Sequence, residues 1–127
     1  MSHGTFATAI NCMDGRTQLP VNEFLKNNYQ VDFVDTITEP GPDKILAENS
    51  DKNIIENIKK RVLISTQKHG SKIIAIVAHA DCAGNPVEKE KHLTHLKQSL
   101  DTIASWQIDA KLISLWVDEN WQVNEIQ

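Results

Sequence analysis

Residues 73–82 read IIAIVAHADC, an apolar run of six residues that ends in a histidine and, three residues later, a cysteine. The run shows no alternation of apolar and polar residues, which is typical of a strand covered on both faces at the centre of a parallel sheet. Gly70 before the run ends a helical pattern, and Pro86 after it suits the first turn of another helix. The stretch therefore predicts a buried strand between two helices, the pattern of an α/β fold.

On either side of this run, the hydrophobic pattern predicts further strands and helices. The predicted strands cover residues 5–11, 31–37, 73–78 and 111–117, with a C-terminal hairpin strand over 121–126. The predicted helices cover residues 20–28, residues 50 or 51 to 70, and a segment that starts at 85 or 86 and carries the apolar stripe Leu93, Leu96, Leu100, Ile103 and Ala104. Residues 39–42 (EPGP) are expected to break any regular element.

Strands that alternate with helices imply right-handed crossovers and a mostly parallel sheet. We expect a three-layer α/β fold with a central four-strand sheet of order 2-1-3-4. Helices should cover both faces, and the hairpin strand should lie at one edge. A chain of 127 residues has the length of one core, so residues 1–127 are expected to form a single domain.

The composition and charge exclude several classes of protein. Hydrophobic residues make up 40% of the chain and charged residues 24%, which excludes general disorder, a collagen-like repeat and a coiled-coil rod. The net charge is −4 and the basic residues are scattered, so no nucleic-acid partner is expected. No apolar run approaches the ~20 residues that span a bilayer, so no membrane partner is expected either. Residues 1–4 (MSHG) lack the regions of a signal peptide, which favours a cytoplasmic location.

The chain has two cysteines, Cys12 and Cys82, and a structural disulfide between them is not expected in a cytosolic protein. Cys12 follows the first predicted strand, whereas His79 and Cys82 follow the third. In the order 2-1-3-4 these two strands are neighbours, and open parallel sheets bind ligands beyond the carboxyl ends of such strands. We therefore expect the three side chains to line one crevice. Two thiolates and one imidazole suit Zn²⁺, and three protein ligands with one open position are typical of a catalytic zinc site.

Asp14 and Arg16 lie on the same loop as Cys12, at two-residue spacing. A carboxylate in a crevice needs a partner, and a guanidinium group can supply one. Held by Arg16, Asp14 could orient a hydroxide bound to the metal; released, it could become the fourth metal ligand. A plain structural ion pair is the alternative interpretation.

The motifs Cys12-x-Asp14-x-Arg16 and His79-x-x-Cys82 resemble the C-x-D-x-R and H-x-x-C motifs of the β-class carbonic anhydrases. The similarity covers roughly residues 5–126 and is specific at the two motifs. It implies a zinc-dependent lyase in which zinc-bound hydroxide hydrates carbon dioxide, or a close analogue such as carbonyl sulfide, reversibly. By position, Cys12, His79 and Cys82 match the zinc ligands, and Asp14 and Arg16 match the catalytic dyad. The resemblance also implies a homodimer or a higher homo-oligomer.

The chain departs from the family pattern at several positions. Gly15 stands where the family usually has Ser, Ala83 stands where a Gly commonly follows the second Cys, and residues 38–41 (TEPG) replace an Asn-Ala-Gly stretch. The family's N-terminal helices, and the Gln that they supply, are not expected here. One alternative is therefore a non-catalytic zinc-binding protein with Asp14 as permanent fourth ligand. Another is a metal-free α/β binding domain.

Other polar and aromatic residues have less specific interpretations. Glu88, His92 and His95 share one helical face and could bind a metal, but the solvated face of a charged helix is the favoured interpretation. Asp81 is expected to cap a loop and not to ligate a metal. The tryptophans are expected to pack the last helix and hairpin and to contribute to a subunit interface; they are Trp106, Trp116 and Trp121.

Overall fold

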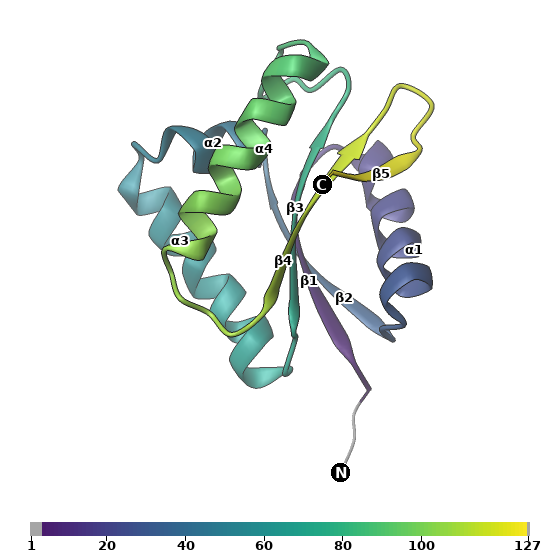
Figure 1. The fold of residues 1–127 in the computed structure, drawn as a ribbon, viewed down its shortest axis with the longest axis vertical. Coiled ribbons are helices and arrows are strands. Elements are labelled where there is room, and N and C mark those ends of the chain that lie inside the picture. Colours follow the sequence, from purple (N-terminus) through teal and green to yellow (C-terminus); the bar gives the residue numbers. More distant parts are fainter. Residues whose placement is uncertain (1–3, 127) are drawn as a thin grey trace.

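The computed structural model describes residues 4–126, and its centre is a five-stranded sheet of order β2-β1-β3-β4-β5 (Figure 1). The first four strands pair in parallel and β5 pairs antiparallel with β4. The predicted order 2-1-3-4 with a C-terminal hairpin strand is therefore confirmed. The strands are β1 (Phe6–Cys12), β2 (Phe33–Glu39), β3 (Ile73–His79), β4 (Lys111–Val117) and β5 (Val123–Ile126).

The central strand β3 is buried on both faces, as its unbroken apolar sequence predicts. Its alternate residues face two different cores: Ile74 and Ile76 pack into one, and Ala75 and Val77 into the other. All four side chains are fully buried. Ile76→Ala should therefore lower the free energy of unfolding by about 2–5 kcal/mol, because the substitution would leave a cavity inside the buried core.

Helices cover both faces of the sheet, so the predicted three layers are confirmed (Figure 1). On one face, α1 (Gln18–Tyr29) buries Val21 and Leu25 against the sheet. On the other face lie α2 (Pro42–Glu48), α3 (Lys52–Leu63) and α4 (Lys89–Ala104). Among residues 4–126, no helix combines the length and the apolar character that a bilayer crossing would need.

The helix α2 follows the segment that the sequence marks only as a break. Gly41 is the N-cap residue with a left-handed φ of 60°, and Pro42 occupies the first turn. Proline suits that position because the N–H it lacks would have no partner within the helix. With seven residues, α2 is too short to show a clear 3.6-residue periodicity.

The helix α4 begins at Lys89 and not at residue 85 or 86, because Glu88 still has an extended backbone with ψ of 171°. The expectation of a solvated face on this helix is also wrong. His92 is 0% exposed and His95 is 6% exposed. The reason is tertiary: α2, which the sequence did not reveal, packs directly against α4 and covers that face.

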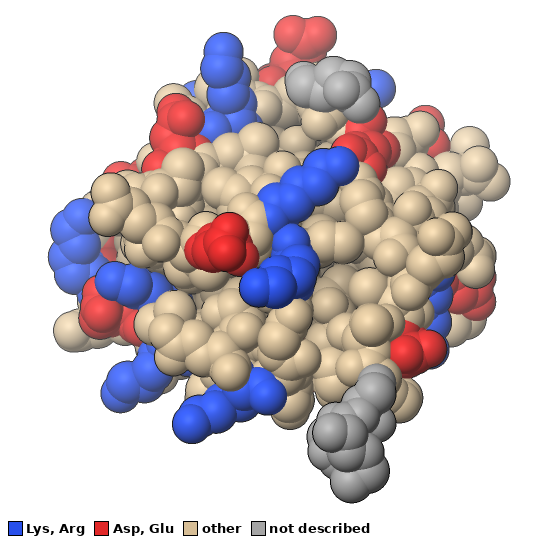
Figure 2. All heavy atoms as spheres, turned by 60° about the horizontal axis from the view of Figure 1, so that its bottom comes forward, with Lys and Arg blue, Asp and Glu red and all other residues tan. Residues whose placement is uncertain are grey.

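Basic and acidic side chains are interspersed on the surface shown in Figure 2. This mixture agrees with the scattered distribution of Lys and Arg along the sequence.

Candidate metal centre

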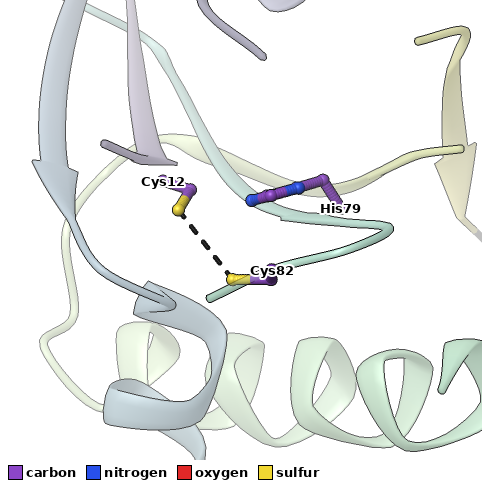
Figure 3. Close-up of side chains that lie close together, drawn as sticks. All are labelled: Cys12, His79 and Cys82. Atoms are coloured by element: carbon purple, nitrogen blue, oxygen red, sulfur yellow. Dashed lines mark hydrogen bonds between the residues drawn. The ribbon is translucent and has the colours of Figure 1, made fainter. Parts of the chain in front are cut away.

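The carboxyl ends of β1 and β3 carry the predicted ligands to one place. β1 ends at Cys12 and β3 ends at His79, and the two strands are paired neighbours. Cys82 follows in the loop after β3, and its sulfur lies beside that of Cys12 (Figure 3). One ligand atom from each of Cys12, His79 and Cys82 lies within 4.8 Å of the other two, and all three residues are buried. The structure therefore brings together three donors from segments that are distant in sequence.

The imidazole of His79 is oriented as a metal ligand requires. Its Nδ1 donates to the backbone carbonyl of Ala80 at 2.7 Å, which assigns the proton to Nδ1 and leaves the Nε2 lone pair free. Nε2 is buried and has no hydrogen-bond partner among the described residues. Figure 3 shows the ring directed towards the two sulfurs. Metal-binding histidines commonly donate their second N–H to a backbone carbonyl in this way.

The two thiols are mutually coupled at a separation of 3.9 Å between Cys12 Sγ and Cys82 Sγ. The hydrogen bond from Cys82 lowers the pKa of Cys12 to about 4, against the opposing effect of burial. The same hydrogen bond, together with burial, raises the pKa of Cys82 well above its usual range. The shared hydrogen bond therefore favours the thiolate at Cys12 and the thiol at Cys82.

The charge of the thiolate also acts on His79. Burial by itself would lower the pKa of the imidazole, but the neighbouring Cys12 thiolate, the Ala80 carbonyl and Asp14 outweigh it and raise the pKa. A cation is therefore favoured at this position, whether it is a proton on the imidazole or an ion between the three donors. An N, S, S donor set is the kind that binds Zn²⁺ and other borderline to soft metals.

Asp14 and Arg16 form an ion pair at the rim of this cluster. Arg16 Nη2 donates to Asp14 Oδ2 at 2.7 Å, and Arg16 Nε donates to Asp14 Oδ1 at 3.0 Å. These hydrogen bonds lower the pKa of Asp14 to about 2, so the carboxylate is ionised at neutral pH. Asp14 Oδ2 lies 3.9 Å from His79 Nε2, so the carboxylate borders the ligand cluster while the guanidinium holds it.

The guanidinium of Arg16 has further contacts that the sequence did not reveal. Arg16 Nη2 donates to the Asp81 backbone carbonyl at 3.2 Å, and Nη1 donates to the Asp81 carboxylate at 3.3 Å. The guanidinium also lies over the Trp121 ring, 4.5 Å from its centroid. Asp81 and Trp121 both have positive φ, 58° and 60°, which is a strained conformation for residues other than glycine. Asp81 thus contacts the dyad and not the Cys and His cluster.

Two residues beside the first motif hold its backbone in place. Gln18 Nε2 donates to the carbonyl of Cys12 at 2.7 Å and to that of Asp14 at 3.3 Å. Asn11 Oδ1 accepts from the backbone N–H of Cys12 at 2.8 Å, and Asn11 is buried. Only their position next to Cys12 and Asp14 in the sequence could have pointed to them, because amide side chains are not specific for a functional site.

Glu88, His92 and His95 do not form a second metal site. Glu88 is exposed, whereas both histidines point into the interface with α2. Within residues 4–126, the group of Cys12, His79 and Cys82 is the one place where three such donors come within reach of an ion.

A family model described as "Putative carbonic anhydrase" matches residues 2–127. No curated protein matches the chain. The β-carbonic anhydrase CafA of the fungal pathogen Aspergillus fumigatus has a similar structure, with a TM-score of 0.54 and 12% identity over 99% of this chain and 76% of that one.

A second solved structure gives the same result. It is one of two tetrameric β-carbonic anhydrases from the filamentous ascomycete Sordaria macrospora, with a TM-score of 0.51 and 12% identity over 99% of this chain and 82% of that one. At this identity the likeness establishes the fold. The family match, which spans nearly the whole sequence, establishes the relationship: the chain belongs to the carbonic anhydrase family that this model describes.

Proposed function

We propose that the chain is a zinc-dependent, carbonic-anhydrase-like lyase that hydrates carbon dioxide or a close analogue reversibly. The observation that carries the proposal is the buried cluster of Cys12, His79 and Cys82, in which the free Nε2 of His79 faces the two sulfurs. Family membership supports the same activity. Three protein donors leave one coordination position open, as in catalytic zinc sites.

The proposed roles follow from the donors and their surroundings. Cys12, His79 and Cys82 would hold Zn²⁺, and the Ala80 carbonyl would keep the His79 ring in the required tautomer. When bound, the ion would supply Lewis acidity that lowers the pKa of a coordinated water towards neutrality. With two thiolates the site is formally neutral, so that acidity is weaker than in a site of three histidines.

Asp14 would orient the reacting water. Its carboxylate is ionised at neutral pH and accepts three hydrogen bonds from Arg16, two from the guanidinium and one from the backbone N–H, so its remaining lone pairs have a fixed direction at the rim of the cluster. A carboxylate held in this way can accept a hydrogen bond from the water and select one orientation of its oxygen lone pair. The positive charge of Arg16 would in turn attract the bicarbonate anion.

A second candidate function is a non-catalytic zinc-binding protein in which Asp14 is the fourth ligand. The 3.9 Å between Asp14 Oδ2 and His79 Nε2 favours it, because a small rotation of the carboxylate would bring an oxygen to an ion between the three donors. In that state Arg16 would release Asp14, and no position would remain for water.

We also propose a single domain that assembles as a homodimer or a larger homo-oligomer. The tetrameric state of the Sordaria macrospora protein supports the assembly. The two free thiols at 3.9 Å fit a reducing compartment such as the cytoplasm, because an oxidising one would favour a disulfide between them.

Metal analysis and stopped-flow kinetics test these proposals together. The purified protein should contain one equivalent of zinc per chain, and the zinc-loaded protein should accelerate carbon dioxide hydration above the buffer rate at mildly alkaline pH. Stoichiometric zinc with no acceleration of carbon dioxide or carbonyl sulfide hydration would establish the non-catalytic alternative. Protein purified without chelators that holds no zinc, and takes none up, would refute both metal-dependent functions.

A further inference from the structure

Two loops contact each other through their backbones: the first contains Pro40 and Gly41, and the second contains Gly84 and Asn85. A Cβ placed on Gly84 would lie 2.5 Å from the carbonyl carbon of Pro40, and one placed on Gly41 would lie 2.7 Å from that of Gly84. Backbone amides of both loops lie beside the sulfurs, that of Gly41 beside Cys12 and those of Gly84 and Asn85 beside Cys82. The relative position of the two loops therefore determines how these backbone N–H groups lie relative to the two sulfurs.

A buried polar cluster joins these loops to α4. Asn85 Nδ2, in the second loop, lies 3.0 Å from Asp43 Oδ2 and 2.9 Å from His95 Nδ1. His92 Nδ1 lies 2.7 Å from the same carboxylate oxygen. Asp43 belongs to the first turn of α2, two residues after Gly41. Asp43 and Asn85 are each 1% exposed, and we call these four residues, Asp43, Asn85, His92 and His95, the amide clamp.

The hydrogen-bond roles in the amide clamp are determined by its donors. The Asn85 amide has two hydrogens, which go to the Asp43 carboxylate and to His95 Nδ1. His95 Nδ1 is therefore an acceptor and its ring is neutral, consistent with the burial that lowers its pKa. His92 Nδ1 carries a hydrogen and donates to Asp43. Each partner thus constrains the orientation of the Asn85 side chain.

Attachment of α2 to α4 does not depend on the amide clamp alone. Ser99 Oγ donates to the backbone carbonyl of Asp43 at 2.9 Å, and Thr102 Oγ1 donates to that of Leu46 at 2.7 Å. These two bonds join the helices without reaching the loop that carries Cys82. Burying a carboxylate among imidazoles is costly, and in some proteins such groups select one geometry among several. Of the residues in the amide clamp, Asn85 is the one in the loop that follows Cys82.

We propose that Asn85, anchored by Asp43, His92 and His95, is a positioning residue that fixes the two loops so that their backbone amides face Cys12 and Cys82, and that it thereby sets the metal affinity and ligand geometry of the site. The inference rests on the proposed metal-binding function. Groups that orient metal ligands from outside the coordination sphere typically change affinity about 10–100-fold when removed.

The first test compares Asn85→Ala with Thr102→Val. Zinc affinity is measured by competition with a chromophoric chelator, and ligand geometry by the sulfur-to-metal absorption band of the Co²⁺-substituted protein. Asn85→Ala should bind Zn²⁺ about 10–100-fold more weakly and shift the Co²⁺ band. Thr102→Val, which loses a buried hydrogen bond between α4 and α2, should lower the Tm but keep the zinc affinity and the Co²⁺ band of wild type. Equal zinc affinity and an identical Co²⁺ band in Asn85→Ala and wild type would overturn the inference.

A second measurement does not require a metal. Amide hydrogen exchange of Gly41 and Gly84 in the metal-free protein should accelerate about tenfold or more in Asn85→Ala. If wild type binds no metal, the proposed function fails, yet unchanged exchange in the variant would separately refute the positioning role.

The pair His92→Leu and His92→Asn serves if Asn85→Ala does not fold. Asn can place a side-chain N–H near the position of His92 Nδ1. His92→Asn should therefore keep the zinc affinity and the slow amide exchange of wild type, whereas His92→Leu should lose both. Equal zinc affinity and equal exchange rates in the two variants would contradict the inference.

Discussion

Cys12 Sγ and Cys82 Sγ lie 3.9 Å apart although 70 positions separate the two residues in sequence. The parallel pairing of β1 with β3 explains this proximity, because its register aligns Ile10 with Ile76 and leaves both strands to end at the same edge of the sheet. The loop after His79 then returns Cys82 to that edge. The geometry of the cluster is therefore a consequence of strand order, and it provides the basis for predictions about the metal.

The first prediction concerns Cys82→Ser. A serine hydroxyl is a poor zinc ligand, so this variant should bind less than one tenth of the zinc that wild type holds, measured by elemental analysis after gel filtration. Zinc at 100 times its Kd should stabilise wild type by about 2.7 kcal/mol and leave the variant unaffected. Ser105→Ala, far from the site in the turn after α4, is the control and should retain zinc. Full zinc occupancy in Cys82→Ser would contradict its role as ligand.

The second prediction concerns Arg16→Ala, which removes the two guanidinium hydrogen bonds to the Asp14 carboxylate and leaves only the one from the Arg16 backbone N–H. The freed carboxylate should rotate to the ion and occupy the open position. Carbon dioxide hydration should fall about 10–100-fold while zinc content stays the same. The Co²⁺-substituted variant should show the spectrum of a closed four-ligand site. In the double variant Arg16→Ala with Asp14→Asn that spectral change should be smaller, whereas an unchanged rate in Arg16→Ala would exclude the dyad from catalysis.

The third prediction concerns the stability of the metal-free protein in acid. Hydrogen bonds from Arg16 lower the pKa of Asp14 from 3.8 to about 2 in the folded state. A lowered carboxyl pKa adds stability that is fully present above the unfolded value and is lost as the pH falls through the folded one. The stability gap between wild type and Asp14→Asn should therefore be constant above pH 5 and shrink from pH 4 towards pH 2, as urea unfolding at each pH would reveal. A gap that widens in this range would contradict the assignment.

The strands and the ligand cluster could be predicted because their signals are local. The run before His79 is apolar at every position, and the ligands directly follow strand ends, where parallel sheets collect side chains. Strand order then followed from the expected fold and was confirmed by the structure. Ligation of an ion by Cys12 and Cys82 stays a prediction, although the structure brings their sulfurs together with the imidazole.

What could not be predicted depends on contacts between segments. α2 is too short to be periodic, and without it the face of α4 that carries His92 and His95 looks exposed. The sequence Asn85-Pro86 predicts a helix start, yet the Asn85 side chain donates a hydrogen bond to Asp43, which lies 42 residues earlier in the chain. Trp121 stacks on Arg16 through a hairpin turn whose position no local pattern encodes. In each case the partner lies more than 30 residues away.

The last prediction compares two glycine substitutions beside the site. In Gly84→Ala the new Cβ would overlap the Pro40 carbonyl carbon at 2.5 Å and the Gly41 nitrogen at 2.7 Å, and both are backbone atoms that cannot rotate away. The loops should separate, so we expect a loss of about 1–3 kcal/mol of stability and weaker zinc binding. Gly15→Ala is the matched control, because its Cβ would meet nothing within 4 Å although it lies between Asp14 and Arg16. It should be neutral or stabilise the protein by about 0.4–1 kcal/mol, since alanine restricts the unfolded chain. Urea unfolding and zinc competition on both variants provide the measurement. If Gly84→Ala is as stable as Gly15→Ala and binds zinc as tightly, the site does not require close contact between the two loops.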